Sequence, residues 1–406
     1  MALSTATMSQ KLTIRDMELR GKRILVRVDY NVPLNARLVV TDDSRIRATL
    51  PTLRYARGKG ARIVLVSHLG RPDGEVVEEL RMAPVARRLG ELLGHSVQYT
   101  RDCIGEDALR HSKELRSGDI LLLENVRFHP EEEKNDPDFS QKLSRLGEVY
   151  INDAFGTAHR AHASTVGVAK FLPAAMGFLM EKEVESLSKI LRNPERPFAM
   201  IVGGAKVSDK VGIFENLIDS LDILLIGGAM AYTFLKVQGL CVGKSMVEEE
   251  KLDLVKELLS KMEKKRLLLK LPIDHVTATV ALKPNPPAER FVRKKEIPEN
   301  EFGYDIGPET VEVFEETLSK AKTVLWNGPL GVFENSLFEK GTRDVAEFLA
   351  KQRGVTTVIG GGDTAAAIAQ FKLTDRMTHV STGGGASLEF LEGKTLPGIA
   401  ALTEKK

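Results

Sequence analysis

The sequence predicts an α/β protein of two doubly wound parallel-sheet domains that face each other across a cleft and are joined by a helix. Three observations lead to this prediction. The chain has 406 residues, which suits two or three domains of about 150 residues each. Short apolar runs alternate with amphipathic helical stretches along the chain. A single charged helical stretch then separates these runs into two groups.

Nine apolar runs of strand length carry the prediction of two sheets. Near-continuous runs of Val, Ile and Leu are typical of strands buried on both faces of a parallel sheet. A buried helical segment is the alternative for any one run, but nine runs flanked by Gly, Asn and Asp argue against it. The runs are 24–29, 62–68, 119–125 and 148–155, followed by 198–204, 222–228, 266–272, 323–328 and 356–362.

The connecting helix sets the predicted domain boundaries. Residues 180–192 read MEKEVESLSKILR, and Pro194 and Pro197 follow where a helix would end. We therefore expect two Rossmann-like domains and a helix between them, with a tail that packs back on the first domain. The predicted ranges are 1–177, 178–193, 194–394 and 395–406.

Composition excludes several classes of protein. Lys and Arg number 58 and Asp and Glu 56, so the net charge of +2 predicts neither a nucleic-acid nor a membrane-surface partner. The two cysteines make no disulfide framework, and no Cys/His cluster has the spacing of a zinc site. No apolar run approaches the roughly 18 residues of a membrane span, and the first ten residues lack the pattern of a secretory signal. We expect a cytoplasmic protein.

Basic side chains gather after the strands of the first half. Residues 1–177 contain 20 Arg and 7 Lys, whereas residues 178–406 contain 8 Arg and 23 Lys. A single Arg after a strand is usually a solvated surface charge. Arg, His, Asp or Asn after four strands of one sheet instead predict a site for a small phosphorylated carboxylic acid. The residues concerned are Asp29, Asn31, Arg45, His68, Arg71, Arg127 and Arg160.

Glycine clusters occupy the corresponding positions of the second half, at 203–204, 227–228, 360–362 and 383–385. Lys206 and Lys210 follow the first cluster, and Asp363 and Thr364 follow the third. Glycines and helix N-termini can hold phosphate oxygens, so this pattern predicts a polyphosphate with a metal ion. Tight strand-to-helix turns are the alternative for any one cluster. No GxGxxG follows the first strand of either half, and residues 239–245 miss the Walker A spacing by one residue, which makes them a connecting turn.

Long motifs in collinear order resemble the phosphoglycerate kinase family over nearly the whole chain. In the first half these are 27–33, 41–52, 67–72, 121–129 and 152–162; in the second half, 203–210, 324–334, 360–365 and 379–393. The first seven residues lie outside the resemblance, which leaves a start at Met8 or an extension from cloning as alternatives. Two departures stand out. Tyr30 replaces an expected Phe, and residues 278–300 are more basic and Pro-rich than expected.

The resemblance implies a reaction in which 1,3-bisphosphoglycerate and ADP give 3-phosphoglycerate and ATP, catalysed by a monomer with Mg²⁺ bound to the nucleotide phosphates. The implied substrate-binding residues are Asp29, Tyr30, Asn31, Arg45, His68, Leu69, Gly70, Arg71, Arg127 and Arg160. The implied nucleotide-binding residues are Lys206, Lys210, Gly228, Gly303, Asn327, Glu334, Gly361, Gly362, Asp363 and Thr364, with Asp363 working with Mg²⁺. The implied catalytic residues are Arg45, Lys206, Gly362 and Gly384.

Two other functions remain as alternatives at this point. A nicotinamide-dependent dehydrogenase would also use two α/β domains, but the missing GxGxxG argues against it. A non-catalytic metabolite-binding protein with two closing lobes would not need Lys206 or Asp363. For Asp363 itself, the alternative to a metal role is a plain helix N-cap.

Overall fold

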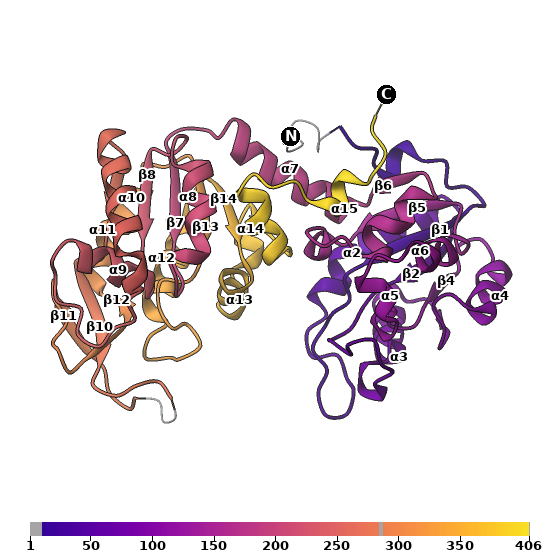
Figure 1. Ribbon diagram of the computed structural model, residues 1–406, viewed down its shortest axis with the longest axis horizontal. Helices are drawn as coiled ribbons and strands as arrows, with labels where there is room; N and C mark the ends of the chain where they lie inside the picture. Colours follow the sequence, from indigo (N-terminus) through magenta and orange to yellow (C-terminus); the bar gives the residue numbers. More distant parts are fainter. Residues whose placement is uncertain (1–9, 284–286, 406) are drawn as a thin grey trace. The chain divides into compact units, whose positions relative to one another are not determined.

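The computed structural model describes residues 10–283 and 287–405. The chain divides into two compact units, one of Met1–Ser188 with Lys394–Lys406 and the other of Lys189–Gly393, here called unit 1 and unit 2. Helix α7 (Phe178–Arg192) contains the division, in the region where the sequence predicts a connecting helix (Figure 1). Met8 and residues 284–286 of the Pro-rich loop lie outside the described residues.

Unit 1 is built on a six-stranded parallel sheet of order β3-β4-β2-β1-β5-β6. Its strands are β1 (Arg23–Val28), β2 (Arg62–Val66), β3 (Val97–Tyr99), β4 (Ile120–Leu122), β5 (Val149–Asp153) and β6 (Ala174–Met176). Alternate residues of β1, such as Ile24 and Val26, pack with Leu53 and Leu89 in one hydrophobic core. Because neighbouring strands run parallel, their carboxyl ends lie along one edge of the sheet.

Helices cover both faces of this sheet. They are α2 (Ser44–Gly58), α3 (Ala83–Leu93), α4 (Glu106–Glu114), α5 (Pro130–Glu133), α6 (Pro137–Ser144) and α15 (Pro397–Ala400). The core that contains Ile24 receives side chains from α2 and α3. A short π-helical turn, η5 (Ala163–Gly167), packs against α5 and α6. This alternation of strands and helices is the doubly wound arrangement that the sequence predicts.

Unit 2 repeats the plan with a second six-stranded parallel sheet, β15-β14-β13-β7-β8-β9. Its strands are β7 (Phe198–Val202), β8 (Ile223–Ile226), β9 (Leu268–Lys270), β13 (Thr323–Asn327), β14 (Thr356–Gly360) and β15 (His379–Val380). Its helices are α8 (Val211–Leu217), α9 (Met230–Val237), α10 (Leu252–Lys264), α11 (Pro308–Leu318), α12 (Lys340–Lys351), α13 (Gly362–Gln370) and α14 (Gly385–Leu391). The buried Trp326 anchors a core that includes side chains of α11 and α12.

Unit 2 also contains a small antiparallel sheet that the sequence analysis does not predict. Its order is β11-β10-β12, formed by β11 (Phe291–Lys294), β10 (Asp274–Ala278) and β12 (Phe302–Ile306). Part of the basic stretch 278–300 forms β11, and Arg293 of this strand is paired with the buried Glu301. The sequence of β11 shows no apolar alternation, because its partly covered face carries Phe291 and Arg293 and its exposed face carries Val292 and Lys294.

All nine predicted strands are present, with ends shifted by a few residues. The strands that the sequence analysis missed are β3, β6, β10, β11, β12 and β15. β3, β6 and β15 have three residues or fewer, too short to show periodicity. Residues 239–245 form a connection and not a strand-to-helix phosphate loop, as predicted.

The carboxyl-terminal residues belong to unit 1 and are hydrogen-bonded to its first residues. The amide of Leu12 donates to the carbonyl of Thr403 at 2.8 Å. The buried ammonium of Lys11 donates to the carbonyls of Ala400 at 3.0 Å and Leu402 at 2.8 Å.

Within the described ranges, no helix is both long enough and apolar enough to cross a bilayer.

Asp153 holds the first turn of α7 to the end of β5. Its Oδ1 atom accepts the amides of Leu179 at 2.9 Å and Met180 at 3.3 Å. These amides would otherwise lack partners at the helix start. The side chain is fully buried, and burial raises the pKa of Asp153 from 3.8 to about 6.

The raised pKa of Asp153 predicts a stability change with a defined sign. Between about pH 4 and pH 6 the folded chain binds this proton more tightly than the unfolded chain, so the free energy of unfolding should fall as pH rises. In Asp153→Asn, which keeps the accepting oxygen, this contribution should vanish. The wild type should thus lose up to about 3 kcal/mol relative to the variant between pH 4 and pH 7.

Urea unfolding at pH 4, 5, 6 and 7 measures this difference. Asp138→Asn, at an exposed position of α6, is the matched control. A difference between wild type and Asp153→Asn that stays constant across this range would contradict the prediction.

Candidate functional site

The carboxyl ends of four adjacent strands of unit 1, β4, β2, β1 and β5, carry the predicted anion-binding residues. Asp29 follows β1, and His68 follows β2. Arg127 lies after β4 and Arg160 after β5. The strand order places these four segments side by side along one edge of the sheet. Arg45, the second residue of α2, reaches the same place, because its Nη1 atom lies 2.6 Å from Oδ2 of Asp29.

The loops at this edge are fixed by hydrogen bonds to their neighbours. Oδ1 of Asn31 accepts the amide of Gly70 at 2.9 Å, so the loops after β1 and β2 are joined. Asn125, which the sequence analysis did not single out, exchanges hydrogen bonds with the backbone of Leu69 and also bonds the amide of Arg127. The Nη1 atom of Arg127 in turn donates to the carbonyl of Gly70 at 3.0 Å. The edge is therefore held in shape without a ligand.

Positive charge dominates the surroundings of His68. Burial and the nearby guanidinium groups of Arg27, Arg127, Arg45 and Arg160 lower the pKa of His68 well below its usual value. Burial first, and then the guanidinium groups of Arg127, Arg27 and Arg160, lower the pKa of His162 to about 4. Both imidazoles are therefore neutral at pH 7. The arginines that lower the pKa of these two imidazoles also create a positive potential, and such a cluster is suited to bind an anion.

Carboxylates balance this charge only in part. Asp29 pairs with Arg45, and Glu133 lies 3.2 Å from Nε of Arg127. Arg160 is half-buried, with His159 as its neighbour at 3.4 Å, and Arg71 is exposed. A phosphate or carboxylate could accept from these guanidinium groups with little loss of existing pairs.

Two residues implied to bind substrate have their side chains in the hydrophobic core. Tyr30 is fully buried, and its hydroxyl lies 2.8 Å from Oγ1 of Thr49. Leu69 is 2% exposed and belongs to the same core. Their side chains are not available to a ligand, so only backbone groups of these residues could reach one. The Tyr in place of Phe is accommodated by Thr49, and Asp29 and Asn31 keep their positions at the edge.

The glycine clusters of unit 2 also share one sheet edge. β15, β14, β13, β7 and β8 are adjacent, and each is followed by a predicted nucleotide residue or glycine cluster. The amide of Gly203 donates to the carbonyl of Asn327 at 2.9 Å, and that of Met230 donates to Gly204 at 3.1 Å. Gly228 has φ +64°, and a Cβ atom there would lie 2.5 Å from the nitrogen of Gly204. The backbone segments approach so closely that only glycine fits.

Polar side chains at this edge contact one another. The ammonium of Lys210 donates to Oδ1 of Asn327, and burial lowers the pKa of Lys210. Asn327 is fully buried, and its Nδ2 atom has no hydrogen-bond partner among the described residues. Oγ1 of Thr364 accepts the amide of Gly328 at 2.6 Å. An unpaired amide donor beside a partly buried cation fits a bound anion.

Lys206 is exposed on the loop between β7 and α8, and Glu248 holds this loop in place. One carboxylate oxygen of Glu248 accepts the amides of Val207 and Ser208, and the other accepts the hydroxyl of Ser208 at 2.6 Å. Glu248 is not predicted from the sequence, because nothing in a run of three glutamates indicates which one is buried.

Asp363 is exposed in the first turn of α13, whose N-cap is Gly361. The alternative of a plain Asp N-cap is therefore wrong. No group of three or more His, Cys, Asp or Glu suitable for a metal occurs within residues 10–283 and 287–405. A single carboxylate fits Mg²⁺ that is held mainly by nucleotide phosphates.

The remaining predicted residues of unit 2 occupy different elements. Gly362 begins α13, and Gly384 is the N-cap of α14. Gly303 lies in β12 so close to Tyr232 of α9 that a Cβ atom would lie 2.2 Å from its hydroxyl. Glu334 is exposed in the connection after β13.

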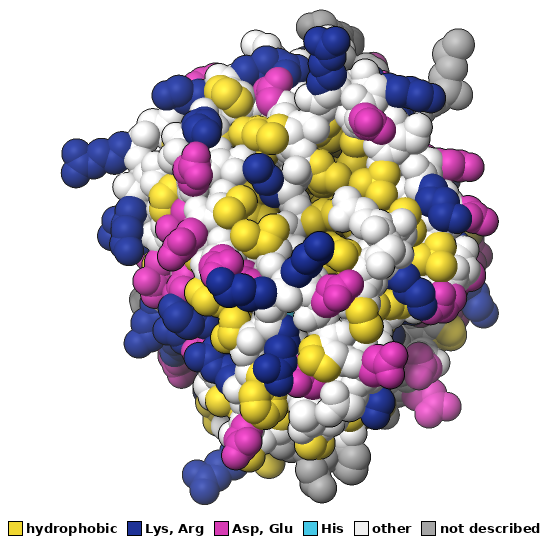
Figure 2. Space-filling model, turned by 90° about the vertical axis from the view of Figure 1, so that its left-hand side faces the viewer, with side chains coloured by type: hydrophobic (Ala, Val, Ile, Leu, Met, Phe, Trp, Pro, Cys, Tyr) yellow, Lys and Arg dark blue, Asp and Glu magenta, His cyan; other side chains and the backbone are white. Residues whose placement is uncertain are grey.

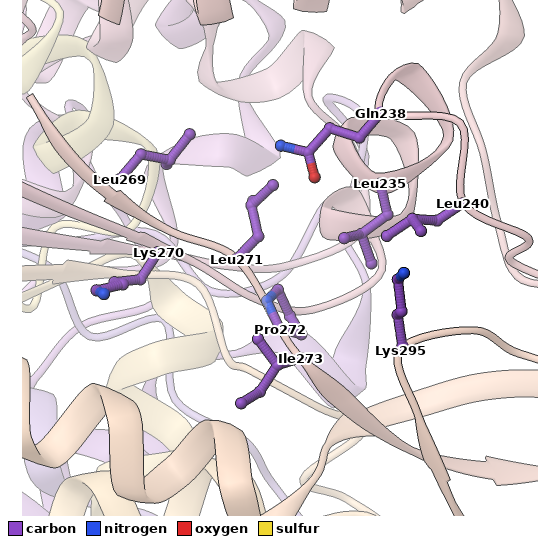
Figure 3. A pocket seen from close by; sticks show the side chains of 9 residues that line it. All are labelled: Leu235, Gln238, Leu240, Leu269, Lys270, Leu271, Pro272, Ile273 and Lys295. Carbon is purple, nitrogen blue, oxygen red and sulfur yellow. The ribbon is translucent and has the colours of Figure 1, made fainter. Parts of the chain in front are cut away.

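An apolar groove of unit 2 involves none of the predicted residues. It is lined by Leu235, Gln238, Leu240, Leu269, Lys270, Leu271, Pro272, Ile273 and Lys295 (Figure 3). Figure 2 shows a face of the molecule on which apolar side chains are interspersed with groups of both charges. Most of its lining is apolar, with Gln238, Lys270 and Lys295 as the side-chain donors, so it is less suited to a phosphate than the glycine-rich edge.

Comparisons with known proteins agree on one family. A family model described as phosphoglycerate kinase matches residues 14–394. The phosphoglycerate kinase of Dictyoglomus turgidum is 53% identical over 394 residues, which cover 97% of this chain and 98% of that protein. That of Pelotomaculum thermopropionicum is 55% identical over 397 residues, or 97% and 100% of the two chains. The solved structure of phosphoglycerate kinase from Coxiella burnetii has a TM-score of 0.86 at 41% identity and covers 96% of this chain and 98% of its own.

The contact at Gly228 predicts a specific loss of stability. Gly228→Ala should lower the free energy of unfolding by the cost of a left-handed alanine, about 1 kcal/mol, plus that of a backbone clash. Gly239→Ala is the matched control, because Gly239 has φ +82° but open space around it. Urea unfolding of both variants separates the two costs. Equal losses would mean that the approach of Gly204 imposes no constraint.

Proposed function

The chain belongs to the phosphoglycerate kinase family. From this premise we propose which substrate of a glycolytic kinase each of its two units binds. Unit 1 binds 3-phosphoglycerate or 1,3-bisphosphoglycerate, and unit 2 binds ADP or ATP. The observation that carries the proposal is the contrast between the two sheet edges. One presents guanidinium groups around a neutral histidine, and the other presents glycines and helix starts.

The proposed substrate site uses side chains that match the parts of phosphoglycerate. Arg71, Arg127 and Arg160 are suited to the phosphate and carboxylate oxygens, because guanidinium groups bind such anions with paired hydrogen bonds. Asp29 and Asn31 have oxygens that can accept a hydrogen bond from the 2-hydroxyl group. His68, neutral because of its arginine neighbours, can donate without adding charge.

The proposed nucleotide site holds phosphates mainly with backbone groups. Gly361 is the N-cap of α13 and Gly362, Asp363 and Thr364 lie in its first turn, where the helix amides and positive end favour an anion. Lys210 and the unpaired amide of Asn327 lie at the neighbouring strand ends. Mg²⁺ bound with the nucleotide supplies neutralisation of phosphate charge, and Asp363 would hold it.

The proposed transfer needs no nucleophilic side chain. Phosphoryl transfer passes through a loose transition state, so positioning and charge stabilisation supply the catalysis. Arg45 from unit 1 and Lys206 from unit 2 would stabilise the transferred group, with Gly362 and Gly384 at helix starts. The two ligands have to meet, so a closing movement of the units is part of the proposal. We further propose a cytoplasmic monomer.

The most direct test of this function is a coupled assay for ATP formed from 1,3-bisphosphoglycerate and MgADP. The two alternatives considered above predict no ATP. A dehydrogenase would instead show a rise in melting temperature with NAD, and a binding protein would bind phosphoglycerate without turnover.

Arg160→Ala should weaken phosphoglycerate binding alone. Loss of a charge-assisted hydrogen bond predicts a KM for 3-phosphoglycerate about 10–100-fold higher, with the Kd for MgADP unchanged. Steady-state kinetics and calorimetry measure the two values. Arg145→Ala, at an exposed position of unit 1, is the control. Equal losses for both ligands would contradict the assignment of one ligand to each unit.

Lys206→Ala should lower kcat by about 10²–10⁴-fold, because its charge acts mainly on the transition state. Lys206→Arg should recover part of this loss, and Lys264→Ala, on the exposed side of α10, should be near wild type. A structural role would instead lower the melting temperature with near-normal turnover. If Lys206→Ala turns over within a few-fold of wild type, the proposed role of this lysine is wrong.

Asp363→Asn should raise the Mg²⁺ concentration needed for half-maximal activity, because an amide oxygen is a weaker ligand than a carboxylate. Titration of activity with Mg²⁺ at fixed ADP measures this shift. Asp375→Asn, exposed in the same unit, is the control. An unchanged Mg²⁺ dependence would exclude Asp363 as the metal-binding residue.

A further inference from the structure

A line of four buried polar side chains runs through unit 1 and ends at His68. It begins at Glu132 of α5 and continues through Ser164 of η5 and Arg27 of β1. These side chains are 0% exposed at Glu132 and Ser164, 1% at Arg27 and 4% at His68. The mechanism proposed above uses only the last of them. Burying a carboxylate and a guanidinium costs desolvation free energy, so a functional role for these groups is worth testing.

Each member of the line contacts the next. The amide of Ser164 donates to Oε2 of Glu132 at 2.8 Å, and the hydroxyl donates to Oε1 at 2.6 Å. The Nε atom of Arg27 donates to Oγ of Ser164 at 2.8 Å. The Nη2 atom of Arg27 lies 3.2 Å from Nδ1 of His68. Arg27 is further held because Nη1 donates to the carbonyl of Val28.

The chemistry of these groups gives the line a direction. The Ser164 hydroxyl has one hydrogen, and the carboxylate of Glu132 can only accept it. The lone pairs of Oγ are then left for Nε of Arg27. A guanidinium can only donate, so Nδ1 of His68 must be the unprotonated nitrogen. The proton of a neutral His68 therefore resides on Nε2.

Electrostatics support the same assignment. Burial and the four arginines lower the pKa of His68, so the ring is neutral and its tautomer is the remaining variable. Burial raises the pKa of Glu132, whereas the nearby Arg27 guanidinium and the hydrogen bonds from Ser164 favour its charged form. Its Oε1 atom lies 3.8 Å from Nδ1 of His162. Glu132 thus lies beside His162 directly and is linked to His68 through Ser164 and Arg27.

We propose that Glu132 is a positioning residue that, through Ser164 and Arg27, holds His68 as the neutral Nε2–H tautomer and so presents a donor to the anion bound by unit 1. This inference rests on the proposed phosphoglycerate site. The competing explanation is a purely structural one, in which Glu132 only ties η5 to α5. That explanation predicts lower stability with no change at the His68 ring.

The tautomer of His68 can be measured directly by ¹⁵N NMR of the ligand-free full-length protein at pH 7, with the signals assigned from a His68→Gln spectrum. The wild type should show a single tautomer, protonated at Nε2. Glu132→Gln and Ser164→Ala should both give a mixture of tautomers and raise the KM for 3-phosphoglycerate at least 10-fold, with the Kd for MgADP unchanged. Glu131→Gln, the exposed neighbour on α5, should match the wild type.

Conservative replacement separates positioning from packing. Ser164→Thr keeps the hydroxyl, so it should show the single tautomer and the KM of the wild type. Its free energy of unfolding reports any strain from the added methyl group. If Glu132→Gln does not fold, Ser164→Ala and Ser164→Thr provide the comparison alone. A single Nε2–H tautomer in Ser164→Ala, or an equal effect of Glu131→Gln, would overturn the proposal.

The outcome distinguishes this proposal from the function on which it rests. Failure of the wild type to bind 3-phosphoglycerate would contradict the proposed substrate site and, with it, the purpose assigned to the tautomer. If 3-phosphoglycerate binds normally but the tautomer of His68 is unchanged by Glu132→Gln and Ser164→Ala, only the positioning role of Glu132 is overturned.

Discussion

The parallel arrangement of strands within each sheet is the constraint on which both candidate sites depend. Parallel strands end at a common edge, so residues more than a hundred positions apart in the sequence, such as Asp29 and Arg160, come to neighbouring strand ends. In unit 1 these ends carry guanidinium groups that are only partly matched by carboxylates. Burial and the positive potential of these arginines keep His68 and His162 neutral. The same positive potential favours the binding of an anion at this edge.

Unit 2 meets a similar requirement with different chemistry. Its strand ends carry glycines, so backbone amides can approach a phosphate where unit 1 uses arginine side chains. Glu248 and Asn327 hold the loops around this edge, as Asn125 does in unit 1. Glu248 and Asn125 are not among the residues expected to touch the ligand, whereas Asn327 both shapes its edge and is a predicted nucleotide-binding residue. Such supporting groups allow weakly bonded donors to remain in place before a ligand arrives.

Much of this organisation can be predicted from sequence, because buried parallel strands are continuous apolar runs and their ends carry polar residues. The small antiparallel sheet could not, since β11 is short and carries one charged residue on each face, Arg293 and Lys294. Arg27 interrupts the apolar run of β1, which is a signal for a buried charge in the sequence. Glu132 and Glu248 each stand in a run of glutamates, and only the tertiary structure distinguishes the buried one. Tyr30 and Leu69 were assigned by motif alone, and the structure places their side chains in the core.

The central claim is that each unit holds its own ligand, and hydrogen exchange measured by mass spectrometry tests it most directly. The account predicts that 3-phosphoglycerate alone protects amides in residues 67–71, 126–128 and 159–162 of unit 1. MgADP alone should protect residues 203–210, 327–334 and 361–364 of unit 2. Protection of the same unit by both ligands, or of neither edge by its assigned ligand, would contradict the account.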